Sequence, residues 1–220
     1  MRRLRAATFI SLDGVMQGPG GPNEDLRDGF RFGGWVAPHF DEKGGRLMGQ
    51  AMGEDYDLLL GRRTYEIFAA HWPHYDDEIG RRFNAINKYV VAGPGTQLGW
   101  ANSHRLEGDA ADAVRSLKAT EGRDLLLQGS GRLIQTLLGA GLIDEMTLLI
   151  HPVVLGQGRR LFEPGAISGG WNLVSTDHTG TGMVVSRYRF AGREVATGTF
   201  ESQPPHPDEL ARRERWAKER

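Results

Sequence analysis

Cysteine is absent from this sequence of 220 residues. Its absence excludes disulfide bonds, thiolate nucleophiles, iron–sulfur clusters and zinc sites built on cysteine. The histidines at positions 71, 74, 104 and 151 do not have the spacing of metal-binding motifs. The sequence therefore predicts no metal site.

Long hydrophobic runs and an excess of one charge are also lacking. There is no apolar run of the roughly 18 residues that a transmembrane helix needs. The basic residues 1–5 are not followed by the apolar segment of a signal peptide. The 27 Lys and Arg nearly balance the 28 Asp and Glu, which gives no electrostatic indication of a nucleic acid or a membrane as partner. We therefore expect a cytoplasmic protein.

The two common nucleotide-binding motifs are missing, although glycine is abundant. Neither a P-loop nor a G-x-G-x-x-G fingerprint at the first strand–helix turn occurs. The 31 glycines are about twice the number expected from the average of roughly 7%. Because glycine loses the most entropy on folding, such a surplus is typical of turns and of close backbone approaches.

Short apolar strands alternate with helices along most of the chain. Continuous apolar runs, typical of strands buried on both faces, occur at 57–61, 88–92 and 124–128. Helical periodicity occurs at 40–52, 62–71, 109–120 and 131–138. Further strands are expected at 4–12, 145–154, 171–178 and 183–190. This order predicts an α/β domain over residues 1–200, with a mainly parallel central sheet, helices on both faces and an antiparallel C-terminal edge.

Two segments fall outside this alternation. Residues 18–34 contain six glycines and two prolines and are longer than a usual connection, which indicates a functional or a mobile loop. Residues 201–220 read as a proline-rich linker followed by a charged helix from 208 onward, with Asp208 as its cap. A solvated helix is the simpler interpretation of this tail, and docking of Trp216 onto a partner subunit is the alternative.

Two strand-to-helix junctions have the residues of an anion site. At 61–64, Gly-Arg-Arg-Thr places a glycine, two guanidinium groups and a hydroxyl where a helix begins. At 129–132, Gly-Ser-Gly-Arg repeats this arrangement, and Ser130 either caps the helix or contacts a ligand. Free backbone N–H groups and the helix dipole attract phosphates at such positions. Solvated arginines with Thr64 as a cap are the structural alternative.

An ordered series of segments resembles a known family. In chain order these are SLDG at 11–14, LGRRTYE at 60–66, KYVV at 88–91, GSG at 129–131, GLIDE at 141–145 and PVVLGQG at 152–158. Together they resemble the dihydrofolate reductase-like family. The closest resemblance is to stand-alone relatives of the C-terminal reductase domain of the riboflavin-biosynthesis bifunctional deaminase–reductase. It covers residues 3–190 and implies a dihydrofolate reductase-like fold that binds NADPH.

The resemblance also assigns site residues by position. The adenosine phosphates would be held by Gly61, Arg62, Arg63 and Thr64, with Val91 and Ala92 also at the cofactor. The diphosphate would be cradled by Gly129, Ser130, Gly131, Arg132 and Leu133. Residues 13–17 would lie beside the nicotinamide, and the substrate would contact Met16, Gln17 and Trp72.

The sequence departs from the family pattern at three places. Ala92 and Gly93 follow Val91 where the family often has a serine or arginine near the 2′-phosphate, so the choice of NADPH over NADH rests on Arg62 and Arg63. The protonating carboxylate has no clear counterpart. Its candidates by proximity are Asp13, Glu24, Asp25 and Asp28. Asp13 is the predicted proton donor, with an ordered water as the alternative. A chain without cysteine cannot contain the zinc deaminase motif of the partner domain.

The expected function is that of a reductase. NADPH would transfer hydride to a pteridine- or pyrimidine-like heterocycle, as in 5-amino-6-(5-phosphoribosylamino)uracil reductase or dihydrofolate reductase. One alternative is a nucleotide-binding module of the same fold without turnover, and another is a purely structural dimer. The expected partners are a small heterocyclic substrate and a second copy of the chain in a homodimer.

Overall fold

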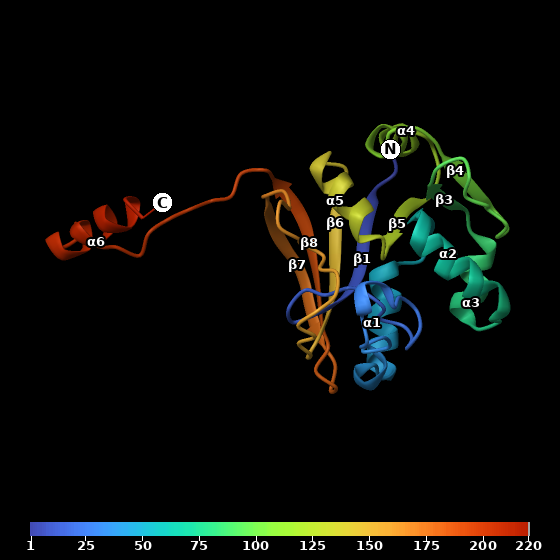
Figure 1. Cartoon of the computed structure of the whole chain (residues 1–220). Helices are drawn as coiled ribbons and strands as arrows, with labels where there is room; N and C mark the ends of the chain where they lie inside the picture. Colours follow the sequence, from blue (N-terminus) through green and yellow to red (C-terminus); the bar gives the residue numbers. More distant parts are fainter. Residues whose placement is uncertain (220) are drawn as a thin grey trace.

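A single eight-stranded sheet forms the centre of the computed structural model, which describes residues 1–219 (Figure 1). The strand order is β4-β3-β2-β5-β1-β6-β8-β7. The strands from β4 to β6 are parallel, and β8 and β7 continue the sheet antiparallel. The strands are β1 (Leu4–Ser11), β2 (Tyr56–Gly61), β3 (Lys88–Val91), β4 (Ser103–Leu106), β5 (Asp124–Gln128), β6 (Glu145–His151), β7 (Gly170–His178) and β8 (Val184–Gly192).

The middle strands are buried on both faces. The leucines at 58–60 and 125–127 have no exposed surface. Leu59, Leu125 and Leu127 pack in one apolar cluster, whereas Leu58 and Leu126 pack in another. Successive residues of a strand point to opposite faces, so each leucine run contributes to both layers. Burying one leucine side chain stabilises the fold by about 1.5–3 kcal/mol.

Helices cover both faces of this sheet. On one side lie α4 (Ala110–Ala119) and α5 (Gly131–Gly139), and on the other lie α1 (Glu42–Met52), α2 (Arg62–His71) and α3 (Glu78–Ala85). Asp109 caps α4 as predicted, because its carboxylate accepts from the N–H groups of Ala111 and Asp112. The α/β class, the mainly parallel sheet and the antiparallel C-terminal edge are confirmed.

The glycine-rich loop between β1 and α1 has an apolar cluster of its own. It contains Val15, Phe30, Trp35 and Val36, all buried. The indole Nε1–H of Trp35 donates to the carbonyl oxygen of Gln17 at 2.8 Å. This segment therefore packs as a folded wall beside the carboxyl ends of the strands, and its position makes it part of the candidate site.

The C-terminal segment lies apart from the sheet. Figure 1 shows α6 (Pro207–Ala217) carried away from the strands by an extended stretch of chain. The predicted cap Asp208 is wrong, because Pro207 is already helical and the ring of His206 accepts from the N–H of Asp208. Over residues 1–219, no helix has the length and hydrophobicity needed to cross a membrane.

Candidate active site

A cavity of about 1350 Å³, called the main cavity below, opens at the carboxyl ends of β1, β2 and β5. Ligands of open α/β sheets bind at this edge, where the loops that follow parallel strands meet. Its lining includes most of the site residues predicted from the sequence, namely Met16, Gln17, Gly61, Arg62, Arg63, Thr64, Trp72, Gly129, Ser130, Gly131, Arg132 and Leu133.

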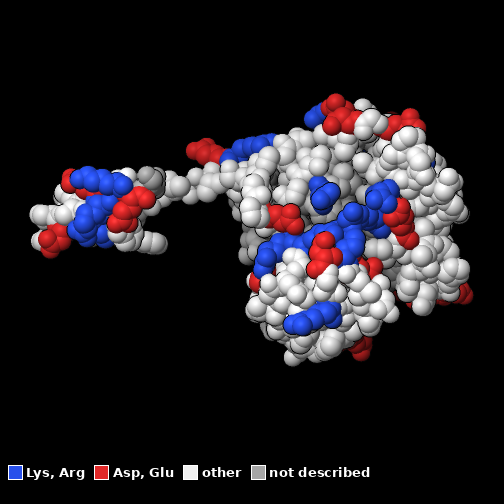
Figure 2. Space-filling view, viewed as in Figure 1, with Lys and Arg blue, Asp and Glu red and all other residues white. Residues whose placement is uncertain are grey.

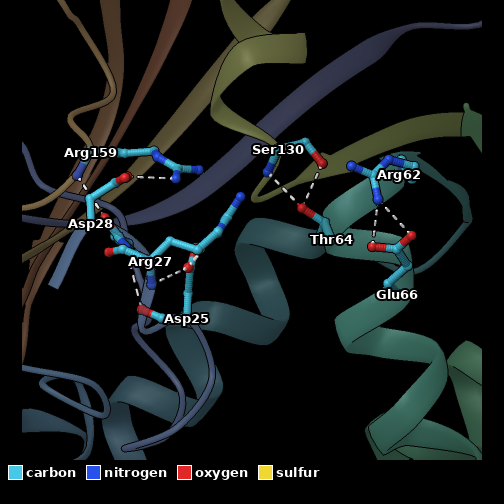
Figure 3. A network of polar contacts seen from close by, with 9 residues as sticks. Asp25, Arg27, Asp28, Arg62, Thr64, Glu66, Ser130 and Arg159 are labelled. Atoms are coloured by element: carbon cyan, nitrogen blue, oxygen red, sulfur yellow. Dashed lines mark hydrogen bonds and ion pairs between the residues drawn. The ribbon is translucent and has the colours of Figure 1, made fainter. Parts of the chain in front are cut away.

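The two predicted phosphate-binding junctions are in direct contact (Figure 3). The Ser130 hydroxyl accepts a hydrogen bond from the N–H of Gly61 and donates one to the Thr64 hydroxyl, both at 2.9 Å. The backbone N–H of Ser130 donates to the same Thr64 hydroxyl at 3.1 Å. Because β2 and β5 are neighbours, the loop after one strand fixes the loop after the other.

The start of α5 forms a cradle of backbone groups. Gly129 and Ser130 both have left-handed backbones, with φ of 60° and 56°. Among residues 1–219, no side chain caps this helix, so Ser130 does not have the capping role considered for it. A Cβ on Gly131 would lie 2.7 Å from the Met16 sulfur, so glycine allows Met16 to pack on the helix start. Uncapped first-turn N–H groups and the helix dipole together favour an anion here.

Six arginines line the main cavity, and Figure 2 shows Lys and Arg side chains in a band across this face of the domain. Four of them are paired with carboxylates: Arg62 with Glu66, Arg27 with Asp25, Arg159 with Asp28 and Arg160 with Asp13. Within the described chain, Arg63 and Arg132 have no ion-pair partner. Their guanidinium groups are therefore available to an anionic ligand.

The opposite wall of the main cavity is apolar. It is built by α1, α2, α3 and the 3₁₀ turn at 72–74 and contains Phe40, Met48, Met52, Phe68, Trp72, Ile79 and Phe83. The Trp72 ring meets the Phe83 ring edge-to-face, with 5.1 Å between centroids. Phe9 of β1 forms part of the floor. An apolar wall beside a basic one suits a ligand with a flat ring and a charged group.

Asp13 lies outside the lining of the main cavity. Its carboxylate accepts from the Ser11 hydroxyl at 2.6 Å and from the N–H groups of Leu155 and Gly156 at 3.1 and 3.0 Å. Burial raises the pKa of Asp13, but these hydrogen bonds outweigh burial and lower it to about 2. An ionised carboxylate that joins two loops is a poor proton donor, so this geometry disfavours the role predicted for Asp13.

Three carboxylates line the main cavity, Glu24, Asp25 and Glu163, and the first two differ in their surroundings. Burial raises the pKa of Glu24, although the N–H groups of Gly20 and Gly21 donate to its carboxylate. Burial also acts on Asp25, but hydrogen bonds from Arg27 outweigh it and lower the pKa. Glu24 is thus the lining carboxylate whose proton is held more firmly than usual.

Comparison with known proteins identifies the family. Residues 2–185 match the family model described as the RibD C-terminal domain. The chain belongs to the RibD C-terminal domain family. The protein YyaP of Bacillus subtilis (strain 168) is 29% identical over 140 residues, which span 61% of this chain and 74% of YyaP.

Solved structures share the fold of this RibD C-terminal domain. A putative riboflavin biosynthesis protein from Shewanella sp. PV-4 has a TM-score of 0.61 at 20% identity, covering 86% of this chain and 98% of that one. Dihydrofolate reductase from Enterococcus faecalis, complexed with NADP(H) and RAB-propyl, has a TM-score of 0.55 at 13% identity, covering 86% and 96%. A deaminase/reductase from Thermotoga maritima has a TM-score of 0.56 at 11% identity, and the match spans 57% of that protein. The dihydrofolate reductase-like fold is therefore shown.

Val91 and Ala92, the remaining predicted cofactor residues, do not line the main cavity. They line a second cavity of about 580 Å³, beside the ends of β3 and β4. Arg62 lines both cavities, so the two spaces meet at this residue.

Several lining residues were missed from the sequence. Gln128 ends β5, lines the main cavity and has a buried Oε1 without a hydrogen-bond partner. A polar residue directly after a buried apolar strand was a signal that could have identified it. Glu107 lines the second cavity directly after β4, a strand whose mostly polar sequence gave no such signal.

Proposed function

We propose that this RibD C-terminal domain is a reductase that takes hydride from a reduced nicotinamide dinucleotide, which the family resemblance implies is NADPH. The hydride acceptor is the C=N or C=O carbon of a flat pteridine- or pyrimidine-like heterocycle. The substrate resembles that of 5-amino-6-(5-phosphoribosylamino)uracil reductase or of dihydrofolate reductase. The observation that carries this proposal is the contact between Ser130 and Thr64, which joins two helix starts into one anion cradle. Homodimerisation and a cytoplasmic location stay predictions.

The residues of the cradle fit a dinucleotide diphosphate. The left-handed pair Gly129–Ser130 and the small Gly131 leave the start of α5 open to a bulky anion. The unpaired guanidinium groups of Arg63 and Arg132 supply positive charge at the same place. In this proposal the backbone positions the diphosphate, and the arginines add affinity.

The bound cofactor would supply the hydride, and the protein would supply position, exclusion of water and a proton. Phe9, Met16 and Trp72 would hold the flat ring of the acceptor in the apolar part of the main cavity. Close positioning of two reactants removes much of the entropic barrier to their reaction.

Reduction of a C=N or C=O bond also needs a proton at the heteroatom. We propose Glu24 in this role in place of Asp13, because Glu24 lines the main cavity and Asp13 does not. Its raised pKa favours the protonated form, which is the form that can donate. Asp25 is held as a carboxylate by Arg27 and is not suited to this step.

Titration with NADPH, followed by quenching of the five tryptophans, tests the proposal. We expect saturation at submillimolar cofactor, and replacing both Arg62 and Arg63 with alanine should weaken binding about 10- to 100-fold. The matched control is the double change of Arg115 and Arg123 to alanine, since both are about half-exposed and lie outside the cavities. No saturable signal would refute the proposal.

Turnover separates an enzyme from a binding module. NADPH consumption with a panel of pteridines and ribosylaminopyrimidines is the expected result. Saturable binding without consumption of NADPH by any of them would instead identify a nucleotide-binding module of the same fold.

A further inference from the structure

The second cavity is the natural continuation of the proposed dinucleotide site. It lies beside the ends of β3 and β4 and shares Arg62 with the main cavity. A dinucleotide whose diphosphate rests at the start of α5 must extend its other ribose past this arginine. The residues around this space are Arg62, Val91, Ala92, Gly93, Pro94, Leu106, Glu107 and Gly108.

Positive charge in the second cavity is weak. Arg62 is the one basic residue among the eight that line it, and one Nη atom of Arg62 donates to both Glu66 oxygens at 2.8 and 3.0 Å (Figure 3). Arg105, on β4, does not line this cavity. Its guanidinium donates to the carbonyl oxygens of Ala92, Gly93 and Thr96, so it shapes the loop from outside the lining. Arg105 is thus held by backbone carbonyl oxygens, and Arg62 reaches the second cavity with one Nη already paired to Glu66.

A carboxylate occupies the rim of the same cavity. Glu107 directly follows β4, is exposed, and has no ion-pair partner in residues 1–219. Gly108 has a φ of +81°, which turns the chain immediately after it. Val91, Ala92 and Pro94 add apolar surface and no hydrogen-bond donor from their side chains.

A carboxylate interacts differently with the ribose of NADH and with that of NADPH. It accepts a hydrogen bond from an unmodified ribose hydroxyl, and it repels the two negative charges of a 2′-phosphate. Resting on the reductase function proposed above, we propose that Glu107 makes the second cavity accept the unphosphorylated ribose. NADH then binds this protein at least as tightly as NADPH.

Calorimetric titrations with NADH and, separately, with NADPH measure the two dissociation constants and so test this inference. The expected result is saturable binding of both, with a dissociation constant for NADH equal to or below that for NADPH. A dissociation constant for NADPH below that for NADH would overturn the inference while leaving the reductase function intact. Binding of neither dinucleotide would overturn the reductase function itself, and the inference with it.

A charge-removing variant tests the role of Glu107. Replacing it with glutamine, E107Q, should tighten NADPH binding about tenfold, the effect of removing one like charge near a partly exposed phosphate. NADH affinity should change less than threefold. The matched control is E121Q, a change at a glutamate that is also exposed and lies before β5, at the amino end of that strand. An unchanged ratio of the two dissociation constants in E107Q, with circular dichroism showing a folded protein, would overturn the assignment.

Discussion

Asp13 and Glu24 are both carboxylates of the segment after β1, yet their surroundings shift their pKa values in opposite directions. Burial raises the pKa of Asp13, but hydrogen bonds from the Ser11 hydroxyl and from the N–H groups of Leu155 and Gly156 outweigh burial and lower the pKa to about 2. Glu24 receives bonds from two N–H groups, but burial has the larger effect and raises its pKa. These differences arise from how the loop folds in three dimensions. The distance of each residue from β1 along the sequence therefore could not show which carboxylate is the better proton donor.

The proton-donor role of Glu24 predicts a specific pH dependence. The donor must be protonated, so the rate of substrate reduction should fall as the pH rises through the raised pKa of Glu24. E24Q removes the proton and should lower the rate by about 100-fold or more. The measurement is the pH–rate profile of the two proteins, with E121Q as the control. An E24Q profile like that of the unaltered protein would contradict the role.

His151 gives a second prediction, for stability. It ends β6 with no exposed surface, and the ring centroids of Phe9 and Trp35 lie 5.6 and 5.4 Å away. Burial lowers its pKa from 6.5; the Leu149 carbonyl opposes this effect and His39 adds to it. The unfolded chain therefore binds the proton more readily than the folded chain does. Stability is complete above pH 6.5 and is lost as the pH falls toward the lowered pKa.

Urea unfolding at about pH 7 and about pH 5 measures this effect. His151→Phe should reduce the loss of stability between the two pH values. His74→Phe, a change at an exposed histidine, should leave that loss unaltered. An equal loss in the His151 variant would show that other groups cause the acid sensitivity.

At the scale of elements, periodicity and apolar runs located most of the sheet and its helices. The runs at β2 and β5 were visible because strands buried on both faces carry no alternating polar residues, whereas β3 alternates between buried and half-buried residues. One strand and one α-helix were missed, besides the short 3₁₀ helices. The sequence SHRL of β4 has three polar residues among its four because this strand lies at the sheet edge, and α3 has only eight residues, with a glycine and two arginines.

The glycine-rich loop provides a prediction for an element. A Cβ at Gly33 would lie 2.5 Å from the carbonyl oxygens of both Gly21 and Pro22. Because these are backbone atoms, Gly33→Ala should displace the wall that lines the main cavity. We expect a loss of about 1–3 kcal/mol of stability and weaker dinucleotide binding. Thermal unfolding and titration with NADPH measure both.

The control for this prediction is Gly21→Ala in the same loop. A Cβ at Gly21 has no atom within 4 Å, so this variant should match the unaltered protein. Equal behaviour of the two alanine variants would show that the loop adapts and does not form a rigid wall.

At the scale of the whole molecule, the family match ends at residue 185, inside β8, and the tail lies beyond it. Hydrogen bonds of the described tail residues 201–219 stay within residues 199–219. Leu210 and Trp216 are about half-exposed on α6. The division into a reductase-like domain of residues 1–200 and a separate tail stays a prediction, and the surroundings of α6 are consistent with it.

Removal of residues 201–220 should leave the domain intact. We expect the free energy of unfolding to change by no more than about 0.5 kcal/mol, because the described tail makes no hydrogen bond to the sheet. Dinucleotide affinity should also be unchanged. Light scattering of the full and shortened chains measures whether the tail assembles subunits. A large loss of stability or affinity would show that the tail packs on the domain.

The central claim is that the main cavity holds a nicotinamide dinucleotide across the ends of β2 and β5. A crystal structure with the dinucleotide bound tests this claim most directly. The predicted result is a diphosphate at the N–H groups that begin α5, between Arg63 and Arg132, with the nicotinamide toward Phe9. A dinucleotide bound elsewhere, or a main cavity that stays empty at saturating dinucleotide, would contradict the claim.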